Sequence, residues 1–152
     1  MQRRHFLLGS AGALLAGLTA WPARAGKTQA NFVQPFSYWQ DKVSDKAWQV
    51  LFRENTEAPG SSPLNHEKLA GTFVCAACQL PLFDSKSKYE SGTGWPSFFA
   101  ALPNAVGTRS DTSFFMTRIE YHCLRCGGHQ GHVFDDGPRP TGKRYCNNGL
   151  AL

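Results

Sequence analysis

The sequence has no apolar segment long enough to span a bilayer as a helix, and it carries little excess charge. Its longest apolar run covers residues 6–20, which is shorter than the roughly 20 residues that a spanning helix needs. The formal net charge is +5; three of the 16 basic residues and none of the 11 acidic ones lie in residues 1–25, so the remainder has 13 against 11, or +2. So weak a charge excludes the class of proteins that bind nucleic acid by neutralising many phosphates.

The first 25 residues have the composition of an export signal. Arg3 and Arg4 precede the apolar run, and residues 23–25 (Ala-Arg-Ala) have the small-x-small form of a cleavage site. The arginine pair followed by His-Phe-Leu-Leu resembles a twin-arginine signal, whose pathway exports proteins that have already folded. A retained membrane anchor is the alternative interpretation. We expect a periplasmic protein that meets the membrane only transiently, through this signal.

Beyond the signal, the sequence predicts a linker over residues 26–43 and one domain over residues 44–152. Ser44 is a suitable N-cap, and apolar residues at 47, 48, 50 and 51 follow at helical spacing, which predicts one short amphipathic helix. From residue 71 onward, short strand-like runs alternate with glycine and proline, and residues 112–123 form the longest strand candidate. No internal repeat of ordinary length is present. The pattern predicts a small, mainly β domain of antiparallel strands with a short helical flank at its N-terminus.

The chain contains five cysteines, and four of them form two C-x-x-C pairs. Cys75 with Cys78, and Cys123 with Cys126, have the spacing with which two tight turns supply the four thiolates of a tetrahedral zinc site. Two disulfides, or a thioredoxin-like redox motif, are the alternatives. A redox motif of that type opens a helix, whereas Gln-Leu-Pro follows the first pair and Gly-Gly follows the second. Because neither following segment continues as a helix, the sequence favours one structural zinc ion.

A zinc ion bound by those four cysteines leaves Cys146 as an unpaired thiol. In an extended strand, Arg144, Cys146 and Asn148 share one face, and a guanidinium close to a thiol favours the thiolate. The pattern therefore predicts a reactive thiol, with a small buried apolar side chain as the alternative interpretation.

Two further clusters carry residues that suit such a thiol. Residues 129–136 include His129 and His132, which act as acids or bases near neutral pH, and a strand here places Asp136 on the side of His132. Either histidine could instead cap a turn or bind the metal. Trp95, in a loop rich in glycine, belongs either to the core or to the wall of an apolar pocket.

Together these residues resemble the zinc-containing methionine-R-sulfoxide reductases of the B type. The resemblance runs from about Asp41 to the C-terminus and rests on four motifs in the family's order, SSPLNHEKLAGTFVCAAC, SGTGWPSFF, CLRCGGHQGHVFDDGP and KRYCNN. It implies a fold of two twisted antiparallel sheets. It also implies a structural zinc ion on Cys75, Cys78, Cys123 and Cys126.

The resemblance further implies roles in catalysis. Cys146 would attack the sulfoxide sulfur as a thiolate and become a sulfenic acid. His132, with His129, would bind or protonate the sulfoxide oxygen. Asn148 would fix the geometry, and Trp95 would hold the S-methyl group and so help to select the R configuration.

The remaining implications concern supporting residues and substrates. Asp136 and Arg144 match positions near the active site of the family. The substrates would be oxidised proteins or peptides, with free methionine sulfoxide as an alternative. A zinc-stabilised binding module, in which Cys146 and the histidines are incidental, is the competing interpretation.

Three positions depart from the family's pattern. Many members place a recycling cysteine two residues before the tryptophan, where this chain has Thr93. We therefore expect an external thiol, such as a thioredoxin-like protein or a small thiol, to regenerate the enzyme. Asn147 replaces an apolar residue and Gly149 replaces a serine, and the sequence offers no physical reason for either.

Overall fold

The computed structural model of the chain describes residues 34–113 and 116–152. The predicted export signal over residues 1–25, and residues 26–33 of the predicted linker, lie outside this part. Within the described ranges, none of the helices is long and apolar enough to cross a membrane.

One α-helix flanks the sheets, as the sequence predicts. Helix α1 (Asp45–Arg53) begins at Ser44, whose hydroxyl accepts a hydrogen bond from the backbone N–H of Ala47 at 3.2 Å. Its buried face is formed by Ala47, Val50, Leu51 and Phe52, and this face packs on β7 and on the C-terminal 3-10 helix η5 (Gly149–Ala151). The 3-10 helix η1 (Phe36–Trp39) packs in turn on α1.

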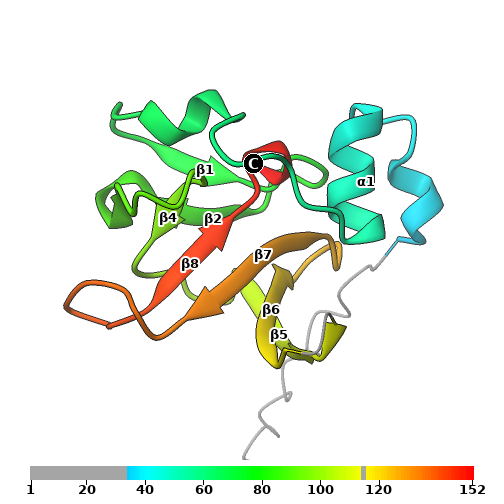
Figure 1. The fold of residues 1–152 in the computed structure, drawn as a ribbon. Helices are drawn as coiled ribbons and strands as arrows, with labels where there is room; N and C mark the ends of the chain where they lie inside the picture. The colour runs from blue at the N-terminus through cyan, green and yellow to red at the C-terminus, as the bar shows by residue number, and fades with distance from the viewer. Residues whose placement is uncertain (1–33, 114–115) are drawn as a thin grey trace, which may run out of the picture.

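The strands form two antiparallel sheets, which confirms the predicted fold class. The smaller sheet pairs β1 (Thr72–Val74) with β2 (Pro81–Asp84). The larger has the order β3-β4-β8-β7-β6-β5, and its strands are β3 (Lys88–Tyr89), β4 (Ser97–Phe98), β5 (Val106–Asp111), β6 (Arg118–Cys123), β7 (His129–Phe134) and β8 (Arg144–Asn147). Figure 1 shows β8 and β7 side by side, with α1 beyond the start of β7 and the C-terminus near β1. Two further 3-10 helices, η2 (Pro63–His66) and η3 (Ser85–Ser87), lie in the connecting segments.

The predicted strand over residues 112–123 is too long at its start. Strand β6 begins only at Arg118, and residues 106–111 form a strand, β5, that the sequence pattern does not reveal. The carboxylate of Asp111 accepts a hydrogen bond from the backbone N–H of Ser113 at 2.9 Å, a local contact that turns the chain and competes with strand pairing.

The register of the large sheet sorts the side chains onto two faces. Cys146 lies opposite both Ser97 and His132, His132 lies opposite Glu120, and Glu120 lies opposite Arg109. Directly opposed residues in an antiparallel sheet point to the same side. Polar and reactive side chains therefore form one row across five strands, and the other face supplies core aromatics, namely Phe98, Tyr121 and Tyr145, packed with Phe83 from the small sheet.

Candidate active site

The two C-x-x-C pairs fold into matching turns. In each turn the first cysteine (Cys75 or Cys123) accepts a hydrogen bond at 2.9 Å from the N–H four residues later and donates one at 2.9 Å to the carbonyl five residues later. The fourth residue after that cysteine has positive φ, 58° at Gln79 and 73° at Gly127. The repeat of the motif in the sequence is thus a repeat of one backbone structure.

The four thiols meet between these turns. Their sulfur atoms lie within 4.8 Å of one another, with 3.7 Å between Cys75 and Cys126 and 3.4 Å between Cys78 and Cys123. A tetrahedral zinc ion with Zn–S bonds near 2.3 Å requires sulfur–sulfur distances of about 3.8 Å, so the cluster fits this ion. All five cysteines of the chain fall within the described residues and none forms a disulfide, which removes the disulfide alternative.

A buried glutamine connects the sulfur cluster to the predicted active site. The side-chain amide of Gln130 donates to the sulfur of Cys75 at 3.6 Å. The carbonyl oxygen of the same residue accepts hydrogen bonds from Asn148, at 2.8 Å from its backbone N–H and 3.1 Å from its side-chain amide. The two centres therefore share one residue of β7.

Cys146 lines a separate cavity of about 130 Å³. The structure brings three of the predicted site residues into its wall with Cys146: Trp95, His132 and Asn148. The other lining residues are Thr56, Arg118, Gly131, Phe134 and Asn147. His129, Asp136 and Arg144 lie outside this lining.

The surroundings of the Cys146 thiol have opposing electrostatic effects. Burial raises the pKa of the thiol above its ordinary value, while the charge of Arg144 and hydrogen bonding by Thr93 and Arg144 oppose that rise. The Arg144 guanidinium donates two hydrogen bonds of 2.8 Å to the carboxylate of Asp136 and lies 4.3 Å from the ring centre of Phe134. Asp136 thus fixes the cation that favours the thiolate, while its own charge raises the thiol pKa.

Each histidine of residues 129–136 has its own carboxylate. The Nε2–H of His132 donates to Asp111 at 2.7 Å, and burial lowers the pKa of His132 despite this acidic partner. His129 is buried, and its Nδ1–H donates to Glu120 at 2.8 Å. The two imidazole rings are 5.5 Å apart and almost edge to face, so His129 lies behind His132 rather than in the cavity wall.

Glu120 is a buried carboxylate with several donors. Burial opposes its charge, but hydrogen bonds from His122 and His129 and the charge of Arg109 hold the pKa of Glu120 at about 2. Its side chain is only 2% exposed. This buried, ionised carboxylate therefore fixes the orientation of the buried His129.

Asn148 and Trp95 are both held by the backbone of Glu57. The side-chain oxygen of Asn148 accepts from the N–H of Glu57 at 3.1 Å, and the indole N–H of Trp95 donates to the carbonyl of Glu57 at 3.1 Å. The amide of Asn148 is thus engaged at both ends, at Glu57 and at Gln130. The polar atoms of this side chain are therefore already hydrogen-bonded within the protein.

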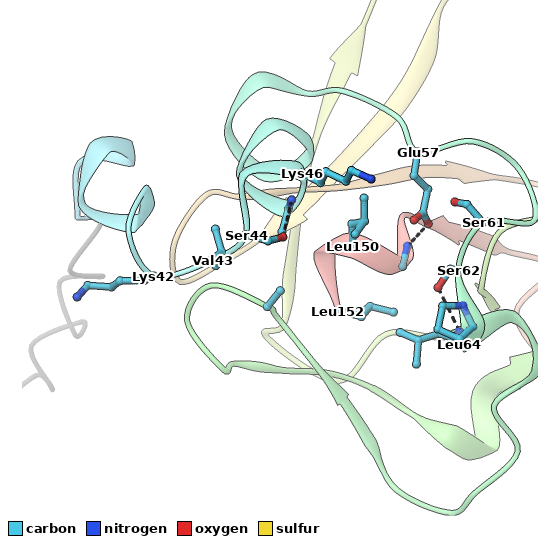
Figure 2. Close-up of a pocket in the computed structure, with 14 residues that line it drawn as sticks. Lys42, Val43, Ser44, Lys46, Glu57, Ser61, Ser62, Leu64, Leu150 and Leu152 are labelled. Carbon is cyan, nitrogen blue, oxygen red and sulfur yellow. Dashed lines mark hydrogen bonds between the residues drawn. The ribbon is translucent and has the colours of Figure 1, made fainter.

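Glu57 also borders a larger hollow of about 560 Å³ beside the start of α1. Figure 2 shows its side chain hydrogen-bonded to the backbone N–H of Gly149, with Lys46, Leu150 and Leu152 around the same space. This hollow has no cysteine or histidine in its lining, so the smaller cavity is the candidate active site.

The structure gives physical reasons for Asn147 and Gly149. Asn147 is fully buried, accepts a hydrogen bond from the hydroxyl of Tyr121 at 2.6 Å and donates to the carbonyl of Asn148 at 2.7 Å. At Gly149 a Cβ atom would overlap the hydroxyl of Ser62 and lie 2.5 Å from the Ser62 Cβ. The polar side chain of Asn147 is therefore satisfied by hydrogen bonds, and Gly149 is required by its close packing against Ser62.

Sequence reasoning missed several residues of the site. Arg118 and Gly131 line the cavity, and Asp111 and Glu120 hold the two histidines. A Cβ at Gly131 would overlap the carbonyl oxygen of Cys146, so the close approach of β7 to β8 depends on this glycine. The sequence places Arg118 and Glu120 on one face of the predicted strand over residues 112–123, which indicates a polar face. It does not indicate which side chains they contact, because those contacts depend on the register between strands.

The cluster and the cavity define a thiol-based enzyme on a two-sheet β fold, with four cysteines placed so that they could hold a metal ion. A family model described as the SelR domain matches residues 43–152, and the chain belongs to this family. It is 50% identical over 115 residues to a protein of Methanosarcina barkeri (strain Fusaro / DSM 804) named peptide methionine sulfoxide reductase MsrB. The aligned residues cover 75% of this chain and 81% of that protein. It is 47% identical over 116 residues to a protein of the same name from Pseudomonas putida (strain W619), covering 75% and 86%.

Proposed function

We propose that this chain reduces methionine-R-sulfoxide in oxidised proteins and peptides to methionine. The observation that carries the proposal is the cavity in which Cys146 meets Trp95 and His132, in a SelR-family chain with relatives named peptide methionine sulfoxide reductase. The enzyme is an oxidoreductase, and its reaction repairs oxidised protein.

Cys146 is the nucleophile of the proposed reaction. Its thiolate attacks the electrophilic sulfur of the sulfoxide, and Cys146 leaves the step as a sulfenic acid. The location of Cys146 in the cavity and the proximity of the Arg144 charge support this role.

Trp95 and His132 bind the two ends of the sulfoxide group. The indole of Trp95 provides an apolar surface for the S-methyl group, and its orientation is fixed by the hydrogen bond to Glu57. His132 faces the oxygen. His129 packs against His132, and Asn148 holds the backbone of Glu57, whose carbonyl accepts the indole N–H of Trp95.

The oxidised enzyme is regenerated by an external thiol, either a thioredoxin-like protein or a small thiol. Thr93, at the position of the recycling cysteine, forms a hydrogen bond of 2.8 Å with Ser91, and Ser91 forms one of 2.7 Å with Ser97. The other four cysteines belong to the sulfur cluster. Mass spectrometry after one turnover without reductant tests this, since a disulfide between Cys146 and another cysteine of the chain would contradict it.

A zinc ion on Cys75, Cys78, Cys123 and Cys126 has a structural role in this proposal. Bound metal would hold the β1–β2 sheet to the turn between β6 and β7 and contribute to the free energy of folding. The four sulfur atoms already have the spacing of a tetrahedral site.

We further propose that residues 1–25 direct export to the periplasm by a twin-arginine pathway. Arg3 and Arg4 before a moderately apolar run support this. A fusion of residues 1–30 to a reporter should reach the periplasm, and replacing both arginines with lysine should abolish its export. Export that survives the double replacement would contradict the twin-arginine route.

An assay with resolved R and S sulfoxides of dabsyl-methionine tests the activity. We expect turnover of the R form with dithiothreitol or thioredoxin and none of the S form. The absence of turnover with either form would favour the zinc-stabilised binding module instead, and comparison with free methionine sulfoxide shows whether the enzyme prefers peptide-like substrates.

A further inference from the structure

Arg118 is a cavity residue with no role in the chemistry described above. It is the first residue of β6, it lies opposite Asp111 of β5, and Ile119 lies opposite Val133 of β7. Because side chains alternate along a strand, Arg118 is on the same face as Glu120, two residues further on. That face carries His132 and Cys146, and Arg118 lines the same cavity.

The contacts of Arg118 leave part of its guanidinium available to a ligand. One terminal nitrogen donates to the Asp111 carboxylate at 2.7 Å. The Nε–H is buried and has no hydrogen-bond partner among the residues that the structure describes. The Nε–H is therefore closed off from the cavity, and a ligand oxygen would instead meet the accessible remainder of the guanidinium, since the Arg118 side chain is 26% exposed and lines the cavity.

Asp111 places this cation beside the active-site histidine. The same carboxylate oxygen, Oδ2, accepts from Arg118 at 2.7 Å and from His132 at 2.7 Å. The Asp111 carboxylate thereby fixes a guanidinium and an imidazole next to each other at one wall of the cavity.

The two groups differ in what they can offer a sulfoxide oxygen. The Nε2–H of His132 is already donated to Asp111, and burial lowers the pKa of this histidine, which disfavours a charged imidazolium near neutral pH. A guanidinium is charged at every relevant pH and carries five N–H donors. A sulfoxide oxygen becomes strongly basic as the S–O bond breaks, so a permanent cation is the more effective donor.

We propose that Arg118 is a further catalytic residue, whose guanidinium donates a hydrogen bond to the sulfoxide oxygen as that oxygen gains negative charge. This rests on the proposed reductase function. In the step, the attack joins the Cys146 sulfur to the substrate sulfur in a transient bond; this bond and the S–O bond of the substrate then break as the oxygen is transferred to the sulfur of Cys146. The substrate sulfur gains two electrons, the Cys146 sulfur loses two, and the proton of the thiol ends on the sulfenic oxygen. Arg118 donates hydrogen bonds and keeps all its protons.

The test measures one turnover of zinc-loaded enzyme on dabsyl-methionine-R-sulfoxide without reductant. Arg118→Met should lower the rate constant of methionine formation by about 100-fold. Arg118→Lys keeps the charge and should lose less. Methylguanidinium added to Arg118→Ala should restore part of the rate. Arg53→Met, which removes an exposed arginine at the end of α1, is the matched control and should keep the wild-type rate.

A second measurement separates catalysis from positioning. Dabsyl-methionine, the product, lacks the oxygen, so its binding constant should be the same in wild type and Arg118→Met. A rate within threefold of wild type in Arg118→Met would overturn the proposal, and so would a loss of product binding as large as the loss of rate. If Arg118→Met does not fold, as judged by zinc content and circular dichroism, Arg118→Gln, which retains a donor for Asp111, is judged by the same two criteria. Failure of the wild-type enzyme itself to turn over would instead contradict the proposed function.

Discussion

The sulfur cluster and the Cys146 cavity use the same side chain in opposite ways. Four thiols lie at the tips of two matching turns, within 4.8 Å of one another. The fifth lies on β8, in a cavity lined by an imidazole, an indole and the Arg118 side chain but by no second sulfur, and the charge of Arg144 lowers its pKa. Sulfur neighbours suit the first group to binding a metal ion, whereas polar and aromatic neighbours suit the fifth to the nucleophilic role proposed for it.

Backbone structure separates the two kinds of cysteine. A tight turn orients two thiols toward one point, which suits a shared ion. A strand presents one thiol per face and surrounds it with the side chains of neighbouring strands. Replacing a cysteine in either region should therefore damage a different property of the protein.

The largest expected effect is on activity alone. Cys146→Ser should abolish turnover of dabsyl-methionine-R-sulfoxide, because a serine hydroxyl is a far weaker nucleophile than a thiolate. Zinc content and the midpoint of thermal unfolding should stay at the wild-type values, because Cys146 takes no part in the cluster. Full reductase activity in this variant would refute the proposed mechanism.

The reciprocal change should remove stability. In Cys78→Ser, the loss of one of four thiolates should reduce zinc binding and destabilise the fold by several kcal/mol, since metal binding and folding are coupled. Metal analysis and thermal unfolding measure both effects, with Cys146→Ser as the control. A variant that keeps its zinc and its unfolding temperature would show that the cluster is not the structural site inferred from its geometry.

A smaller effect is expected where the C-terminal helix η5 packs on Ser62, beside the larger hollow. Gly149→Ala adds a Cβ into the space occupied by Ser62, and overpacking of this kind costs about 1–3 kcal/mol. The double variant Gly149→Ala with Ser62→Gly should recover most of that loss in chemical denaturation. Equal stability of Gly149→Ala and wild type would mean that the backbone of η5 can move aside.

The sequence predicts both sulfur regions well and their electrostatic surroundings poorly. The C-x-x-C spacing and the unpaired Cys146 are local features, and both appear in the structure where the sequence predicts them. The carboxylates of Asp111 and Glu120 depend on pairing between strands. Strand β5, which carries Asp111, is an edge strand without a fully buried residue, so it has no apolar alternation to detect.

Gln130 connects the two regions, and its replacement distinguishes a shared structure from two independent ones. Gln130→Leu removes the N–H donated to Cys75 at 3.6 Å, and loss of such a contact to a metal ligand typically weakens metal binding by about 10-fold or somewhat more. We expect faster zinc transfer to a chromogenic chelator. The activity of the fully loaded variant should change little, because the backbone carbonyl of Gln130 still holds Asn148. An unchanged rate of zinc release would show that the contact contributes nothing to the site.

The smallest effect concerns the pH dependence of Cys146. Burial raises the pKa of this thiol, so the thiolate, and with it the rate of a single turnover, should increase as the pH rises above neutrality. Arg144→Met removes a positive charge that lowers this pKa, and should move the rise to higher pH and slow the reaction a few-fold at neutral pH. Asp136→Asn removes a negative charge that raises the pKa of Cys146, and should move the rise in rate to lower pH.

Alkylation of Cys146 by iodoacetamide across pH measures both shifts, in zinc-loaded protein where the other four thiols are protected. If the two variants move in the same direction, Asp136 acts mainly by holding Arg144 in place.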